Sequence, residues 1–262
     1  MMNIVSIKKF YEQTGLRHGL IMLSILVLWS SSYIGIRYAL TSYTPENLGF
    51  LRYLMASVVF LIIATFQKIK LPEIKDLPGL TAIGLFGFTL YNLLLNYGET
   101  TVDAGTSSFI INTVPFFSLL FAVLKKQERA KKSDWLGLVI AFSGVALIVF
   151  SKNKGLNTFN WYTVLILGAA ICQALSFSIQ KQYLIKYTPV ELTSYTIWIG
   201  TILMAFFTKQ PFSTIVSSPL FQTLTIVYLG VFPGAIAFLL MGIALKKYQL
   251  SKISSYLFLI PL

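Results

Sequence analysis

The chain contains a succession of apolar runs, each roughly 17–25 residues long, separated by short polar segments. Such a run forms a helix long enough to cross the roughly 30 Å hydrocarbon core of a bilayer. Because lipid offers the backbone no hydrogen-bond partners, spanning segments of this kind fold as helices. Only 11% of the residues are charged, against about 25% in a soluble domain. We therefore predict an all-α polytopic membrane protein with the lipid bilayer as its surroundings.

The apolar runs predict nine helices joined by short loops, so helices adjacent in sequence should be antiparallel neighbours in space. We expect them near residues 19–40, 48–66, 78–97, 104–124, 134–150, 161–185, 192–207, 222–245 and 250–262.

An internal repeat further restricts the architecture. Gly84–Pro115 aligns with Gly230–Pro261 at a shift of 146 positions, with six identical residues. Upstream, Tyr43-Thr44-Pro45 aligns with Tyr187-Thr188-Pro189 at a shift of 144. The repeat predicts two copies of one helical unit. The sixth helix is the partner of the first. Because a copy has five spans, which is an odd number, the second copy should cross the bilayer upside down relative to the first. Inverted copies place a shared site near the midplane of the membrane.

The predicted organisation is an inverted repeat of five-helix units. We expect a cytoplasmic N-terminal arm over 1–18, a first repeat over 19–150, an outer linker over 151–160 and a second repeat over 161–262. Pro261 corresponds to Pro115, beyond which the first copy continues to residue 150. We expect the second copy to be truncated, leaving about nine of ten spans; a short re-entrant last segment is the alternative.

The net charge of +12 comes from basic residues in the short loops, so we do not expect a nucleic-acid partner. If the N-terminus is cytoplasmic, fifteen Lys and Arg residues lie inside and three outside, the distribution typical of membrane proteins. The inner set is Lys8, Lys9, Arg17, Lys68, Lys70, Lys75, Lys125, Lys126, Arg129, Lys131, Lys132, Lys186, Lys246, Lys247 and Lys252, and the outer set is Lys152, Lys154 and Lys209.

Several short motifs occur in the same order along the first copy: Leu51-Arg52-Tyr53, Asn96-Tyr97-Gly98, the segment from Ala104 to Pro115, Glu128-Arg129, and Gly137 with Gly144. In order and spacing the chain resembles the EamA-like members of the drug/metabolite transporter (DMT) superfamily. The resemblance implies ten helices in two inverted repeats, a central cavity, and export or exchange of small metabolites such as amino acids. We expect an integral protein of the bacterial cytoplasmic (inner) membrane.

Polar residues inside the predicted spans are the candidate substrate-binding residues, because polar groups at this depth need a partner. They form stripes at helical spacing on four helices. These residues are Trp29, Ser32 and Tyr33; Tyr91, Asn92 and Asn96; Ser108 and Asn112; and Gln173, Ser176 and Gln180. The alternative for each is helix packing, which small and amide side chains also provide in membranes.

Two further sets of residues allow more than one interpretation. Pro115 and Pro261 free the carbonyls of Ile111 and Leu257, which could line the cavity, although a simple kink is the favoured alternative. Among the charged residues, we expect Arg37 and Arg52 to anchor span ends at the interface, and the alternative is that they attract an anionic group at the outer mouth. We expect Glu99 and Asp103 to be solvated turn carboxylates, and the alternative is that either takes a proton in a coupled cycle. Lys181 lies in the inner half of its span and is a candidate for mutation.

Residue types needed for catalysis are scarce. The chain has one histidine, His18, and one cysteine, Cys172, with no cluster that predicts a metal site, a catalytic residue or a cofactor. We predict a secondary transporter of small solutes rather than an enzyme, with a non-transporting membrane protein (an inactive remnant or a partner subunit) as the alternative. The oligomeric state is left open.

Overall fold

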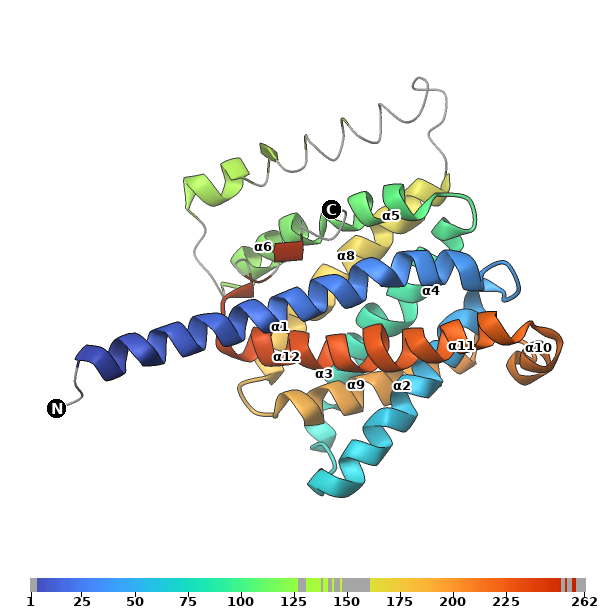
Figure 1. Cartoon of the computed structure of the whole chain (residues 1–262), viewed down its shortest axis with the longest axis horizontal. Coiled ribbons are helices and arrows are strands. Elements are labelled where there is room, and N and C mark those ends of the chain that lie inside the picture. The colour runs from blue at the N-terminus through green and yellow to red at the C-terminus, as the bar shows by residue number, and fades with distance from the viewer. Residues whose placement is uncertain are drawn as a thin grey trace.

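The structure is a computed structural model that describes residues 4–126, 131–137, 139–140, 143, 147, 161–250, 253, 256 and 257. All regular structure in these residues is helical, and the helices pack into one bundle (Figure 1). The helices are α1 (Ile4–Ala39), α2 (Pro45–Gln67), η1 (Ile74–Asp76), α3 (Leu77–Gly84), η2 (Leu85–Leu90), α4 (Tyr91–Glu99), α5 (Ala104–Ile111), α6 (Val114–Leu124), α8 (Trp161–Tyr183), α9 (Pro189–Ala205), α10 (Pro211–Ser217), α11 (Leu220–Leu229), η4 (Gly230–Ile236) and α12 (Ala237–Lys247).

Six helical stretches in the described residues are long and apolar enough to cross a membrane. They are Gly19–Ala39, Pro45–Gln67, Ile74–Glu99, Ala104–Leu124, Trp161–Tyr183 and Leu220–Lys247. The prediction of an all-helical membrane protein is thereby confirmed. The count of nine spans stays a prediction. The segments 134–150 and 250–262 lie largely outside the described residues, and α9, with 17 residues, is slightly too short to count among these six stretches.

Three elements differ from the sequence-based expectation. The helix α1 begins at Ile4, so most of the expected arm over 1–18 belongs to the same helix as the first span. The helix predicted over 104–124 is broken after Ile111, and Pro115 lies in the first turn of α6. Proline is well placed there because its missing N–H has no helical partner in a first turn. The short α10 was not predicted, since seven residues are too few to span a bilayer.

The two Tyr-Thr-Pro motifs are helix starts. Thr44 precedes α2, and its hydroxyl accepts a hydrogen bond from the backbone N–H of Asn47. Thr188 does the same for α9 by accepting from the N–H of Glu191, whose carboxylate accepts from the Thr188 N–H in return. The following proline fits the first helical position. The repeat therefore encodes the same capped turn twice.

A π-helical turn interrupts the third helix of each copy at corresponding positions. The segment η2 covers Leu85–Leu90 and η4 covers Gly230–Ile236. A shift of 146 carries residues 85–90 onto 231–236. Wide turns of this kind inside α-helices occur frequently at functional sites. The two copies therefore share a local backbone irregularity as well as sequence identities.

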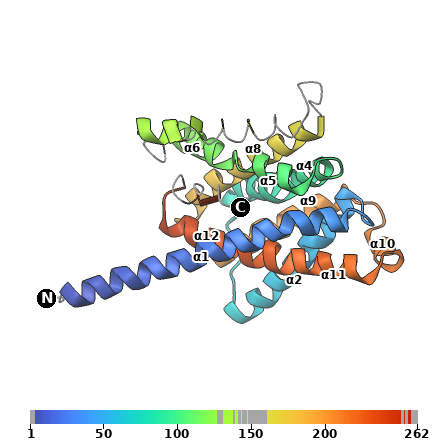
Figure 2. The same ribbon diagram turned by 45° about the horizontal axis from the view of Figure 1, so that its top comes forward.

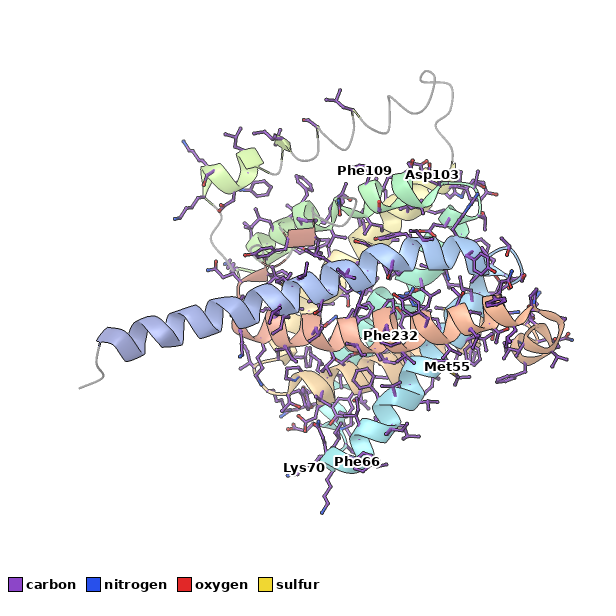
Figure 3. The ribbon with its side chains drawn as sticks, viewed as in Figure 1. Met55, Phe66, Lys70, Asp103, Phe109 and Phe232 are labelled. Atoms are coloured by element: carbon purple, nitrogen blue, oxygen red, sulfur yellow. The ribbon has the colours of Figure 1, made fainter. Side chains whose placement is uncertain are left out.

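Each copy packs its third helix against the second helix of the other copy, and one glycine makes each contact close. A Cβ added at Gly84 would lie 3.0 Å from the carbonyl oxygen of Thr196 in α9. A Cβ at Gly230 would lie 2.5 Å from the carbonyl oxygen of Arg52 in α2 and 2.5 Å from the Cβ of Met55. In Figure 3, Met55 and Phe232 mark this junction of α2 with η4. Arg52 and Thr196 correspond at a shift of 144.

The first helices of the two copies run in opposite directions. In Figures 1 and 2, α1 passes from left to right, whereas α8 passes from right to left. Their neighbours also correspond, since α1 packs on α11 and α12 while α8 packs on α3 and α4. These exchanged contacts bring α1 and α8 to opposite sides of a shared interior.

Candidate functional site

A cavity lies between α1, α2, α4, α5, α6, α8 and α12, where the two copies meet. The space open to the centre of a water molecule is about 20 Å³, which is room for one or two waters. Five of the predicted site residues line it: Trp29, Ser32, Tyr33, Tyr91 and Gln173. The rest of the lining is Arg52, Ile111, Val114, Phe177, Phe238 and Leu257.

The lining from α1 is a single helical face. Ser32 and Tyr33 follow Trp29 by three and four residues, so the three side chains project to the same side. The indole Nε1 of Trp29 donates to the carbonyl oxygen of Pro233 in η4 at 3.3 Å. The indole ring lies 6.2 Å from the ring of Phe177 and 5.3 Å from that of Phe238. These contacts hold an aromatic wall against the cavity.

The two first helices contribute corresponding residues to the cavity. A shift of 144 carries Trp29 onto Gln173 and Tyr33 onto Phe177, and all four line the cavity. The space therefore lies between equivalent faces of the two copies. The residue types at these corresponding positions differ, so α1 and α8 present different chemical groups to the cavity.

Gln173 offers the cavity an amide with unused bonding capacity. Its side chain is only 4% exposed, and neither its oxygen nor its nitrogen has a hydrogen-bond partner among the described residues. Buried polar groups usually have partners, and an unpaired one is unfavourable by about 1–3 kcal/mol. An amide in this condition can donate to and accept from a bound solute.

Arg52 corrects a sequence-based expectation. Interfacial anchoring was expected, but its side chain is 3% exposed and lines the cavity. Its Nη1 donates to Oδ1 of Asn92 at 3.2 Å, and its guanidinium carbon lies 5.5 Å from the ring centre of Tyr53. Its Nε has no partner among the described residues. The expectation was wrong because α2 turns this face toward η4 rather than toward lipid.

Asn92 does not line the cavity but accepts a hydrogen bond from the guanidinium of Arg52, which does. Its Nδ2 donates to the hydroxyl of Tyr53 at 2.7 Å and to the carbonyl oxygen of Phe88 at 3.0 Å, while its Oδ1 accepts from Arg52. All of these groups are buried. The amide thereby fixes the position of Arg52 relative to α4.

The other predicted site residues lie outside the cavity lining. The Asn96 amide donates to the carbonyl oxygen of Pro45, and the Ser108 hydroxyl donates to that of Gly105 within its own helix. The amide of Gln180 donates to the Ser176 hydroxyl at 3.0 Å. Asn112 is buried at the end of α5, next to the lining residue Ile111. A direct contact of these residues with solute stays a prediction.

Glu99 also lies deeper than expected. We expected a solvated turn carboxylate, but its side chain is 0% exposed at the end of α4. Asp103, in contrast, caps α5, since its carboxylate accepts from the backbone N–H and the hydroxyl of Thr106. Arg37 is exposed and donates to the backbone carbonyl oxygen of Glu99, in agreement with its expected place near a span end.

Lys181 stabilises a helix end. Its ammonium donates to the carbonyl oxygen of Leu245 at 2.5 Å and to that of Tyr248, at the C-terminus of α12. Terminal carbonyls lack partners within the helix and attract cations. The carbonyls of Ile111 and Leu257 were also candidates for the cavity lining. Both residues line the cavity, and a contact of their carbonyls with solute stays a prediction. Pro261 lies outside the described residues.

Opposite ends of the bundle are closed by the two Tyr-Thr-Pro turns. At what we term the Tyr43 end, the hydroxyls of Tyr43 and Thr223 are 2.7 Å apart. At the Tyr187 end, the Tyr187 hydroxyl donates to Oδ2 of Asp76 at 2.5 Å. Lys186 there pairs with Asp76 at 2.5 Å and with Glu73 at 2.6 Å. Each contact joins one copy to the other.

No group of three or more metal-ligating residues occurs in the part of the chain that the structure describes. The single cysteine, Cys172, is half-buried. The polar chemistry gathered at the cavity is thus a guanidinium, an amide, a serine hydroxyl and aromatic groups with polar tips. This set can bind a solute by charge and hydrogen bonds.

Comparison with known proteins gives the family. A model of the EamA-like transporter family matches residues 17–150 and 160–262. The chain is 34% identical to the uncharacterized transporter YdfC of Bacillus subtilis, over 89% of this chain and 76% of that protein. It is 32% identical to a probable terminal-alkyne amino-acid exporter of Streptantibioticus cattleyicolor, over 90% of this chain and 79% of that protein.

A solved crystal structure has the same fold, with a TM-score of 0.69 at 16% identity, over 94% of this chain and 84% of that one. The resemblance noted in the sequence motifs is confirmed, as is the expectation of a transporter rather than an enzyme. Two matched EamA domains agree with a repeat. The chain belongs to the EamA-like transporter family of the DMT superfamily.

Proposed function

We propose that this protein is a secondary transporter that exports or exchanges small amino-acid-like metabolites through the cavity between α1 and α8. The observation that carries the proposal is the lining itself. A buried guanidinium, Arg52, and a buried unpaired amide, Gln173, share one space bounded by corresponding faces of the two copies.

The chemistry of the lining suits a zwitterion. The Arg52 guanidinium is complementary to a carboxylate in charge and in hydrogen-bond geometry. The rings of Trp29, Tyr33 and Tyr91 provide faces that attract an ammonium group and accommodate an apolar side chain. The printed name of one relative, a probable terminal-alkyne amino-acid exporter, supports the same class of solute.

Two copies inserted in opposite directions would let the site open to either side of the membrane. The opposite directions of α1 and α8 support this arrangement, as do the exchanged contacts at Gly84 and Gly230. The described conformation has room for only one or two waters, and both the Tyr43 end and the Tyr187 end are held together. We interpret it as a closed state of an alternating-access cycle.

The distribution of Lys and Arg supports an orientation with the N-terminus and the Tyr187 end in the cytoplasm and the Tyr43 end outside. Lys70, Lys75 and Lys186 lie near the Tyr187 contacts. In this orientation an exported solute would reach the cavity from the Tyr187 end and leave at the Tyr43 end. The alternative function, a non-transporting membrane protein, predicts no solute flux.

The test is flux in proteoliposomes. Purified protein is reconstituted, and efflux and exchange of a radiolabelled amino-acid mixture are compared for wild type, Arg52→Gln and Arg37→Gln. We expect Arg52→Gln to reduce flux at subsaturating solute roughly 10- to 100-fold, because a hydrogen bond to a charged group is worth about 1.5–3 kcal/mol.

Arg37→Gln is the matched control, since Arg37 is exposed and does not line the cavity. It should retain most of the wild-type flux. Equal losses of flux in both variants would contradict the cavity as the solute-binding site. If wild-type protein shows no flux of amino acids, nucleobases or sugars, the non-transporting alternative is favoured.

A further inference from the structure

One buried carboxylate is not used by the proposed transport site. Glu99 ends α4 at the Tyr43 end of the bundle and is 0% exposed. Neither of its carboxylate oxygens has a hydrogen-bond partner among the described residues. Buried carboxylates are ordinarily paired or hydrogen-bonded, so this side chain needs an explanation.

Among the residues that the structure describes, the groups around Glu99 do not supply a donor to its carboxylate. From α1, the guanidinium of Arg37 donates to the backbone oxygen of Glu99 rather than to its side chain. From α2, Arg52 attracts the carboxylate electrostatically, but its guanidinium donates to Asn92. Asp103, before α5, repels it.

The other neighbours of Glu99 within the described part of the chain are neutral. Tyr33 of α1 and Tyr91 of α4 interact electrostatically with Glu99. From α8, the side chain of Ile166 and the backbone oxygen of Tyr162 lie against Gly98, the residue before Glu99. An ionised carboxylate here would be withdrawn from water with no hydrogen bond from a described residue to compensate, which is strongly unfavourable. A bound proton removes that charge.

Glu99 is also linked to the cavity. Its electrostatic partners Arg52, Tyr33 and Tyr91 all line the space where we place the solute. The exposed Arg37, which contacts the backbone of Glu99, lies six residues before Tyr43 in the chain. Opening of this end would bring water to the carboxylate, and water stabilises the ionised form.

We propose that Glu99 is a proton-binding site of the transport cycle, protonated in the closed conformation and ionised when the Tyr43 end opens to water. Closing takes one proton from water onto a carboxylate oxygen, and opening on that side returns it. The proposal rests on the proposed transport function for its role in the cycle, but the proton site itself can be tested without any solute.

The first experiment measures thermal unfolding of the purified full chain in detergent from about pH 5 to about pH 8. A carboxyl that is protonated when folded and ionised when unfolded stabilises the fold at low pH, and this stabilisation is lost as pH rises. Wild type should therefore lose stability across this range relative to Glu99→Gln, which stays neutral. Glu46→Gln, a control at the same end whose carboxylate accepts from the Tyr97 hydroxyl, should follow wild type.

Parallel curves for wild type and Glu99→Gln would overturn the proton site. If Glu99→Gln does not yield folded protein, Glu99→Met provides a second neutral side chain of similar volume for the same comparison. A curve for Glu99→Met that retains the full wild-type dependence on pH would overturn the proposal equally.

The second experiment tests the role in transport by following flux of the radiolabelled amino-acid mixture against pH. Wild type and Glu46→Gln should slow as pH rises, because closing needs a proton, whereas Glu99→Gln should lose this dependence. If wild type shows no flux at any pH, the proposed function fails while the unfolding curves still decide the proton site. If wild-type flux is independent of pH, transport stands and its coupling to Glu99 fails.

Discussion

The Tyr43 end and the Tyr187 end begin with the same three residues and are closed by different chemistry. At the Tyr43 end, two neutral hydroxyls meet across the copies at 2.7 Å. At the Tyr187 end, the tyrosine hydroxyl meets the carboxylate of Asp76, which also pairs with Lys186. The same three residues thus lie at a contact between the copies at each end, and the groups that meet their tyrosine differ.

This difference affects how each end responds to its surroundings. Hydrogen bonds from Lys186 and then Lys75 hold the pKa of Glu73 below its ordinary value of 4.5. Ion pairs at an exposed surface weaken with salt, whereas a hydroxyl pair does not. We therefore expect the Tyr187 end to open more readily at high ionic strength, and the Tyr43 end to be indifferent to it.

The largest expected asymmetry between the copies is steric and concerns the two corresponding glycines. Gly230→Ala should destabilise the fold by about 1–3 kcal/mol, because its Cβ would meet the Arg52 backbone at 2.5 Å. Gly84→Ala should have a smaller effect, since its nearest approach is 3.0 Å. Thermal unfolding in detergent measures both.

Gly137→Ala is the control for the glycine pair, because a Cβ at Gly137 meets nothing within 4 Å. It should leave the unfolding temperature unchanged or raise it slightly through helix propensity. Equal losses at Gly84 and Gly230 would mean that the two contacts between copies are sterically equivalent.

The second prediction breaks the charged closure. Asp76→Asn removes the carboxylate that accepts from Tyr187 and pairs with Lys186, so the Tyr187 end should open more often. In a Cys172→Ser background, Ser32→Cys places a thiol in the cavity lining. Asp76→Asn should increase the rate at which a membrane-impermeant maleimide labels this thiol from the Tyr187 side. The rate of labelling from the Tyr43 side should be unchanged.

A third prediction tests the neutral closure. Tyr43→Phe removes one hydrogen bond and should destabilise the protein by about 0.5–1.5 kcal/mol. The loss should be the same at low and high salt, as measured by thermal unfolding in each. A loss that shrinks with added salt would show that charge contributes at this end as well.

The smallest effect concerns acid. Because the folded-state pKa of Glu73 is lowered, its pairing stabilises the fold above the ordinary value of 4.5 and is lost as pH falls through the folded value. The difference in unfolding temperature between wild type and Glu73→Gln should therefore be present near neutral pH and shrink below about pH 4. A difference that persists in acid would assign the effect to packing.

The sequence predicted the helices well because their physical cause is local. An apolar run of sufficient length must be helical in lipid, whatever its neighbours are, and α2 and α8 follow the predicted ranges to within a few residues. The α10 helix was missed because seven residues of mixed polarity carry no such constraint. The break before α6 was read as a kink because the sequence places Pro115 inside an unbroken apolar run.

The site was harder to predict than the fold. Polar stripes on α1 and α8 identified Trp29, Tyr33 and Gln173, which the structure brings to one cavity. Stripes of the same kind also marked Asn96 and Gln180, whose amides bond elsewhere in the bundle. A stripe specifies one face of one helix, and it does not specify which helix that face meets.

Sequence alone determined the membrane class and most of the long helices and indicated a repeat, since hydropathy, capping residues and repeated spacing all act over short stretches of chain. Only the tertiary structure decided the environments of Arg52 and Glu99. Distance along a span gives the depth of a residue, but burial depends on the neighbouring helix. Here the exchanged packing of the two copies turned both charged side chains away from lipid and water.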